Sequence, residues 1–189
     1  IPPLETQQKI VKILDKFTEL EATLEAELAL RKRQYQYYRD FLLDFDNQIG
    51  GGIADGYKGR LKDVVWKTLG EVVPISRGKR LVRSQLQDNG QYPVYQNSLQ
   101  PLGFYDNQNC RAYMTFVIAA GAAGEIGFSD IEFWAADDCY YFDCPKEILH
   151  DKFLYYFLLS ERHQLTSQIR KASVPRLGRG SIEKIKIPI

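Results

Sequence analysis

Apolar side chains recur at alternating spacings of four and three residues through the first part of the chain. These positions are Ile10, Leu14, Phe17, Leu24, Leu28, Tyr35, Tyr38, Leu42 and Phe45, with Glu21 and Arg31 at the two polar positions of the series. The spacing is the heptad pattern of a coiled coil, sustained over about five heptads. No glycine or proline interrupts residues 6 to 46, so the pattern predicts one continuous helix.

A helix of this length needs a partner for its apolar seam. At about 1.5 Å per residue it is roughly 60 Å long, which is too long for one small domain to cover. We therefore expect the seam to pack against another helix, either in a homodimer or on a different subunit. Glu21 and Arg31 carry opposite charges, and pairing between them across an antiparallel dimer would fix its register. The alternative is a long helix that lies along its own domain.

Residues 61 to 189 show a different pattern, in which short apolar runs alternate with turn-forming residues. Strands are predicted at 64–66, 72–75, 92–95, 116–119, 126–128, 131–134 and 139–142, and again at 182–189. Helices are predicted at 146–160 and 160–171. The predicted fold class is α+β: a long coiled-coil helix (residues 1–48), a glycine-rich linker (49–60) and a β-rich mixed domain (61–189).

The charge balance limits the functions that this chain can have. Its formal net charge is +1, whereas a non-specific DNA-binding domain is usually far more basic. DNA binding therefore requires a local concentration of Arg and Lys. The sequence has no run of about 18 apolar residues, so we expect no membrane-spanning segment. Three cysteines without metal-type spacing, and no leader sequence, indicate reduced thiols in a cytoplasm.

Two basic clusters supply such a concentration. The first holds Arg77, Lys79, Arg80 and Arg83 around Gly78, and the second holds Arg170, Lys171, Arg176 and Arg179. Glycine lets a backbone approach a phosphate closely, and Arg or Lys binds a phosphate or a guanine edge. The alternatives are a solvated turn for the first cluster and, for Arg170 and Lys171, cations that decorate a helix C-terminus.

A pair of amides is a third candidate for DNA contact. Gln96 and Asn97 follow the predicted strand 92–95. Gln and Asn side chains contact adenine bidentately, but Asn serves equally well in local turns. Both interpretations stay open at this point.

Motifs for catalysis are missing. The glycine-rich segment 121–127 lacks the lysine of a phosphate-binding P-loop and is more typical of a tight turn between strands. Asp137 and Asp138 suggest a carboxylate metal site, but no nuclease-type Glu-x-Lys pattern follows them. A zinc site needs about four ligands, and the chain offers only three cysteines and two histidines. We therefore predict no catalytic residue, no metal and no cofactor in this chain.

The opening segment resembles the helical region of Type I restriction–modification specificity subunits. The resemblance rests on the proline pair of IPPLE, the QQKIV run, ILDKFTELEATLEAEL and RKRQYQYYRD. Residues 64–189 resemble the target-recognition domain of the same family, through WKTLGEV, ISRGKR, YPVYQNS, GFYD, FWAADDCYYF and VPRLGRGSIEKIKIPI. A full subunit of that family runs recognition domain, helix, recognition domain, helix, so this chain resembles a half-length form.

The resemblance implies a non-catalytic subunit that binds double-stranded DNA in the cytoplasm of a bacterium or archaeon. Its DNA contacts would come from the basic clusters and the amide pair. Its partners would be methyltransferase (modification) subunits, which bind S-adenosylmethionine, and a restriction motor subunit. Two copies paired through the helix would rebuild a two-domain reader of a palindromic, interrupted target. The alternative is a coiled-coil adaptor or truncated pseudo-subunit that does not bind DNA.

Overall fold

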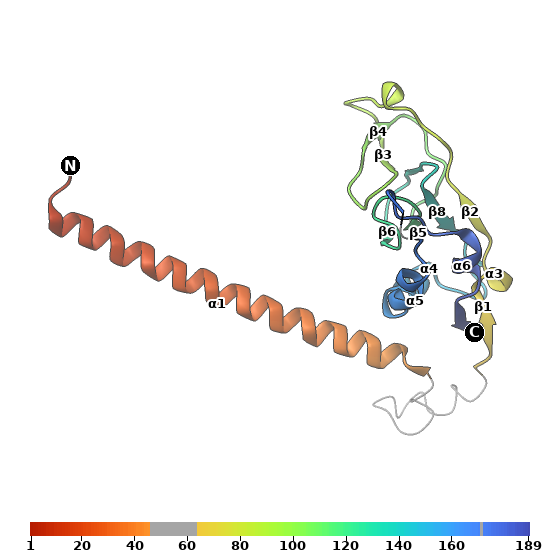
Figure 1. Cartoon of the computed structure of the whole chain (residues 1–189), viewed down its shortest axis with the longest axis horizontal. Helices are drawn as coiled ribbons and strands as arrows, with labels where there is room; N and C mark the ends of the chain where they lie inside the picture. The colour runs from red at the N-terminus through yellow and green to blue at the C-terminus, as the bar shows by residue number, and fades with distance from the viewer. Residues whose placement is uncertain (46–63, 171) are drawn as a thin grey trace. The chain divides into compact units, whose positions relative to one another are not determined.

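The computed structural model describes residues 1–45, 64–170 and 172–189 of the chain (Figure 1). The chain divides into two compact units, Ile1–Asp44 and Phe45–Ile189. The first is built on a single long helix, α1 (Leu4–Leu43), and the second is rich in short strands. The predicted fold class, a long helix followed by a β-rich α+β domain, is therefore confirmed. The predicted linker 49–60 lies outside the described residues.

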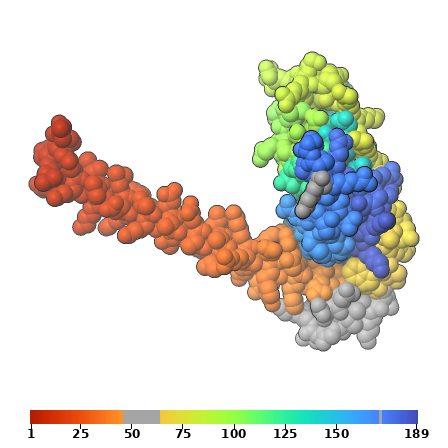
Figure 2. Space-filling view, in the orientation of Figure 1, coloured from red at the N-terminus to blue at the C-terminus, as the bar shows by residue number. Residues whose placement is uncertain are grey.

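Helix α1 leaves the apolar positions of its seam from Ile10 to Leu42 in solvent. None of its side chains is buried, and Phe17, Leu24 and Leu28 are 63%, 56% and 54% exposed. Figure 2 shows the helix, red to orange, as a rod with the width of a single helix. Its sequence is rich in Leu, Glu and Lys, which have high helix propensity. The unit Ile1–Asp44 contains no second helix to cover the seam.

The second unit contains nine short strands within its described residues. They are β1 (Trp66–Thr68), β2 (Ile75–Arg77), β3 (Tyr92–Tyr95), β4 (Gly103–Tyr105), β5 (Met114–Ile118), β6 (Ile126–Ser129), β7 (Trp134–Ala135), β8 (Cys139–Phe142) and β9 (Lys186–Pro188). The helices are α3 (Leu69–Val72), α4 (Asp151–Ser160), α5 (Arg162–Ser167) and α6 (Arg179–Glu183), with a 3-10 turn, η2 (Arg83–Gln85). The strands form three sheets with orders β1-β9, β2-β8-β5-β6 and β4-β3-β7. Among the described strand pairs, only β3 and β7 run parallel.

Strand β5 lies between two hydrophobic cores. All of its residues are buried, and its side chains alternate between the two faces of the sheet. Val117 belongs to the core that includes Leu154 and Phe157 of α4. Phe116 belongs to the other core, where its ring lies 4.7 Å from that of Tyr95, centroid to centroid. A strand covered on both faces has a continuous apolar run, and this run predicts the strand from the sequence.

The strand predictions differ in accuracy along the chain. Strands β3 and β8 have the predicted bounds, and β5 and β6 overlap their predictions. The prediction at 72–75 is wrong except at its last residue, because Leu69–Val72 forms α3. Thr68 N donates to Glu71 Oε2 (2.9 Å) as half of a capping box, which starts a helix there. Strand β4 was not predicted, and β1 and β7 are shifted toward the C-terminus of their predictions.

The C-terminal helices are shorter than predicted. Helix α4 begins at Asp151 instead of residue 146. Nδ1 of His150 caps this start by accepting a hydrogen bond from Lys152 N (3.2 Å). Helix α5 ends at Ser167 instead of residue 171. The predicted strand 182–189 is reduced to β9, because Arg179–Glu183 forms α6. No helix in the described ranges is both long and apolar enough to cross a membrane.

Candidate nucleic-acid interface

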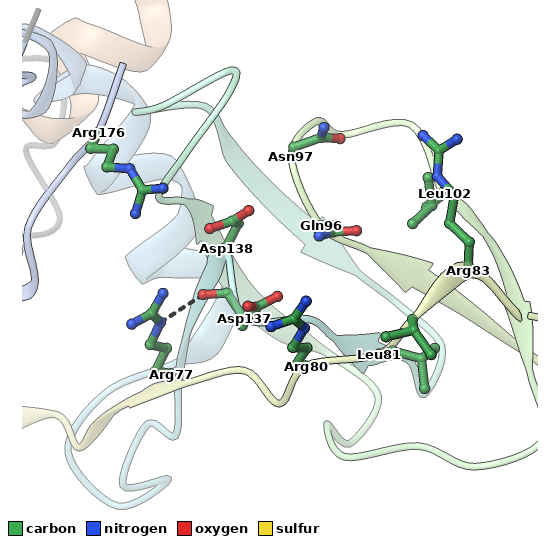
Figure 3. A pocket seen from close by; sticks show the side chains of 11 residues that line it. Arg77, Arg80, Leu81, Arg83, Gln96, Asn97, Leu102, Asp137, Asp138 and Arg176 are labelled. Atoms are coloured by element: carbon green, nitrogen blue, oxygen red, sulfur yellow. Dashed lines mark hydrogen bonds between the residues drawn. The ribbon is translucent and has the colours of Figure 1, made fainter. Parts of the chain in front are cut away.

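One hollow of about 470 Å³ on the β-rich domain is lined by segments that lie far apart in the sequence (Figure 3). Its polar lining consists of Arg77, Arg80, Arg83, Gln96, Asn97, Asp137, Asp138 and Arg176, and its apolar lining of Leu81, Val82 and Leu102. We call this set the arginine hollow. It unites residues of both predicted basic clusters with the predicted amide pair. It is the local concentration of cations that DNA binding would require of a chain with a net charge of only +1.

Backbone hydrogen bonds hold the segment that carries the first basic cluster. Arg77 is the last residue of β2, which pairs with β8. The backbone N–H groups of Gly78 and Lys79 donate to carbonyls of Cys139 and Ala135, each at 2.9 Å. The chain after β2 is therefore fixed by its main chain, and the side chain of Arg80 stays exposed.

The amide pair is held by its main chain as well. The Gln96 carbonyl accepts a hydrogen bond from Cys139 Sγ (3.1 Å), and the Asn97 carbonyl accepts one from Ala122 N (2.9 Å). Tyr95, just before the pair, packs between aromatic rings of the core, and burial raises the pKa of its hydroxyl. Among the described residues, neither side-chain amide forms a hydrogen bond, so both are available to a ligand.

Arg176 reaches the hollow from the C-terminal end of the domain. Its N–H donates to the Arg170 carbonyl (3.3 Å), and its own carbonyl accepts from Arg170 N (2.9 Å). The next residue, Leu177, is buried and donates its N–H to the Ala119 carbonyl (2.8 Å). This anchoring fixes the position of the Arg176 backbone beside the end of β5 while its side chain is exposed.

The turn between β7 and β8 places two carboxylates in the arginine hollow. Arg77 Nε donates to the main-chain carbonyl of Asp137 (2.6 Å), and the Asp138 carbonyl accepts from Ala119 N (2.6 Å). In the sequence, these two acids suggest only a metal site. Among the residues that the structure describes, no group of three or more His, Cys, Asp or Glu side chains is arranged to hold a metal ion. Their position among the arginines depends on tertiary contacts, which the sequence pattern does not predict.

Three predicted DNA-binding residues do not line the arginine hollow. Lys79 and Arg179 are exposed but are not among its lining residues, and Arg179 Nε pairs with Glu183 Oε1 at 2.7 Å. Lys171 lies outside the described residues. A contact between these three residues and DNA stays a prediction.

A long helix followed by a β-rich domain with a cationic hollow is the arrangement of a DNA-recognition protein. Residues 1–30 and 62–189 match the family described as the Type I restriction modification DNA specificity domain. A Mycoplasma pneumoniae protein assigned as a type I specificity subunit is 31% identical over 193 residues, which cover 98% of this chain and 72% of that protein. The chain belongs to the Type I DNA specificity family.

Solved structures show the same fold. A type I restriction–modification S subunit from M. genitalium superposes with a TM-score of 0.62 at 18% identity, over 68% of this chain and 35% of that one. A chain from a structural study of assembly in the type I R-M system superposes with a TM-score of 0.60 at 17% identity, over 100% of this chain and 48% of that one. This chain therefore spans less than half of each of these two solved chains.

Proposed function

We propose that this chain is a half-length specificity module whose β-rich domain binds one half-site of double-stranded DNA in the arginine hollow. The observation that carries the proposal is the convergence of four arginines and two amides on one hollow. Arginine binds phosphate and guanine, and amides bind adenine, so this set of side chains suits both backbone contact and base recognition. Membership of the DNA specificity family supports the same function.

Three of the four arginines of the hollow form no ion pair among the described residues and are available to a ligand, whereas Arg77 donates to the Asp137 carbonyl. No ion pair of the described residues includes Arg80, Arg83 or Arg176. By contrast, Arg111 is held by Asp151 (2.7 Å) and Asp143 (3.3 Å) and serves the fold. Cations that are exposed and unpaired retain their full capacity to displace counterions from DNA. The alternative, an adaptor without DNA binding, gives these unpaired cations no role.

The test is equilibrium binding of the full chain to a labelled duplex of mixed sequence, followed by fluorescence anisotropy over a range of salt concentrations. Arg80→Ala and Arg176→Ala should each weaken binding, and loss of a phosphate contact should reduce the slope of log K against log salt by about 1. Arg162→Ala is the matched control, because Arg162 is an exposed arginine outside the hollow.

The outcomes separate the two functions. Weaker binding by the hollow variants but not by the control supports the proposal. Equal effects of all three variants would mean that the hollow is not the site. No salt-dependent binding by the unaltered chain would reject DNA recognition and favour the adaptor.

The wider assembly is part of the proposal. We infer that α1 pairs two copies of the chain and docks methyltransferase subunits, which supply the S-adenosylmethionine, and that a restriction motor subunit joins the complex in the cytoplasm. The chain itself would contribute no catalytic group and bind no cofactor. The exposed seam of α1 supports a helical partner, and family membership supports the kind of complex. Co-purification of the chain with its methyltransferase subunit, before and after substitution in the seam, tests this arrangement.

A further inference from the structure

The two carboxylates of the arginine hollow are out of keeping with a site for phosphate alone. Figure 3 shows Asp137 and Asp138 in the middle of the hollow, with Arg77, Arg80 and Arg176 around them. A carboxylate repels a phosphate group, so acids at the centre of a purely phosphate-binding surface would weaken binding. Their presence points to a ligand that offers hydrogen-bond donors as well as acceptors.

The carboxylates are not neutralised by the arginines beside them. No ion pair within the described part of the chain includes Asp137 or Asp138. Arg77 donates to the main-chain carbonyl of Asp137, not to its carboxylate. One carboxylate oxygen of Asp137, Oδ1, is buried without a hydrogen-bond partner among the described residues. Such a group is costly unless a ligand or a rearrangement on binding satisfies it.

Base-pair edges differ in whether they match this mixture of groups. In the major groove, guanine presents two acceptors, N7 and O6, which arginine binds, while the cytosine of the same pair presents an amino donor, N4, which a carboxylate binds. An arginine and an aspartate side by side therefore complement a G·C pair. The amides Gln96 and Asn97 at the other side of the hollow suit adenine and leave the acids for cytosine.

We propose that Asp137 and Asp138 are specificity-determining residues, which accept a hydrogen bond from the amino group of a cytosine while a neighbouring arginine of the hollow binds the guanine of that pair. This inference rests on the proposed DNA-recognition function and deepens it. In this role the acids lower the affinity for DNA of any sequence and raise the preference for a G·C pair. Replacing a purely structural residue would not change these two properties in opposite directions.

The experiment is selection of bound duplexes from a randomised pool by the full chain, by Asp137→Asn and by Asp138→Asn, each followed by sequencing. Asp106→Asn is the matched control, because Asp106 is an exposed acid outside the hollow. We expect the unaltered chain to select a motif with a G·C pair. We expect at least one of the two hollow variants to lose discrimination at that position by roughly 5- to 100-fold, as for the loss of one good base contact.

A second measurement keeps the inference distinct from loss of folding and from failure of the proposed function. On a duplex without the motif, the same variant should bind more tightly than the unaltered chain, because a repelling charge has been removed. An unfolded variant would bind more weakly.

Two results would overturn the inference while leaving DNA recognition intact. One is a motif unchanged in both hollow variants, and the other is tighter binding to all duplexes with unchanged base preference. If the unaltered chain selects no motif at all, the proposed function itself fails.

Discussion

At the scale of single residues, the arginine hollow depends on close approach of main chains. A Cβ atom placed on Gly78 would lie 2.1 Å from the Ala136 carbonyl oxygen and 2.4 Å from that of Ala135. No side chain fits there, so only glycine lets the segment after β2 lie against the β7–β8 turn. The same contact sets the spacing between Arg77 and the two aspartates of that turn.

Gly78→Ala should therefore destabilise the domain by about 1–3 kcal/mol, the usual cost of forcing extra atoms into a packed site. It should also weaken DNA binding, since the displaced segment carries Arg77 and Arg80. Urea unfolding measures the first effect and anisotropy the second. Gly180→Ala is the control, because nothing lies within 4 Å of an added Cβ there and alanine favours the helix α6. A Gly78→Ala variant as stable as the unaltered chain would contradict this account.

The three cysteines are structural. All are free and buried, and burial raises the pKa of the Cys110 and Cys144 thiols to about 12 and raises that of Cys139 as well. A buried neutral thiol is a poor nucleophile. We expect slow labelling by a thiol-reactive disulfide reagent at pH 8 in the folded chain and rapid labelling in urea. Rapid labelling of the folded chain would show that the cysteines are accessible.

The direction of these shifts also predicts an alkaline dependence of stability. Because the folded state holds the proton more tightly than the unfolded state, the contribution is complete below the ordinary thiol pKa of 9.0 and decreases as the pH rises toward about 12. The urea midpoint should fall across that range, and Cys110→Ala with Cys144→Ala should make the fall shallower. An unchanged slope would assign the alkaline sensitivity to other groups.

At the scale of elements, the sequence predicts best what local pattern decides. The heptad spacing identifies α1, and continuous apolar runs identify β5 and β8. It fails where a side-chain cap overrides the apolar pattern, as Thr68 and Glu71 do in starting α3. It also fails at β4, whose three residues are paired with β3 by tertiary structure and carry no alternation of their own.

The candidate site follows the same rule. The two basic clusters can be identified from the sequence alone, and all four arginines of the hollow belong to them. The sequence does not predict that the two clusters lie at one site. Arg77 and Arg176 are brought together by the pairing of β2 with β8 and by the hydrogen bond between Leu177 and Ala119. The role of Asp137 and Asp138 depends on the arginines around them, so no pattern in their own segment distinguishes them from a surface turn.

At the scale of the whole molecule, each unit exposes a surface that suits a binding partner. The helix exposes an apolar seam, and the β-rich domain exposes unpaired cations. A seam of Leu, Ile, Phe and Tyr side chains is satisfied by another helix, and a cationic hollow by a polyanion. If the helix pairs with its own copy, one complex carries two arginine hollows related by two-fold symmetry. A palindromic target divided by a spacer then follows from symmetry, as the resemblance implied.

The dimer can be tested by light scattering of the purified chain. Leu24 and Leu28 are exposed seam positions, and burying one leucine is worth about 1.5–3 kcal/mol. Leu24→Asp combined with Leu28→Asp should therefore raise the dissociation constant by more than about 100-fold and give a monomer. Leu30→Asp is the matched control: Leu30 is 63% exposed on the same helix, but two residues beyond Leu28 it faces away from the seam. A dimer that only the seam variant dissociates supports pairing through α1 and a symmetric target. A monomer before any substitution would mean that the seam binds a different subunit, and the target would then have no reason to be palindromic.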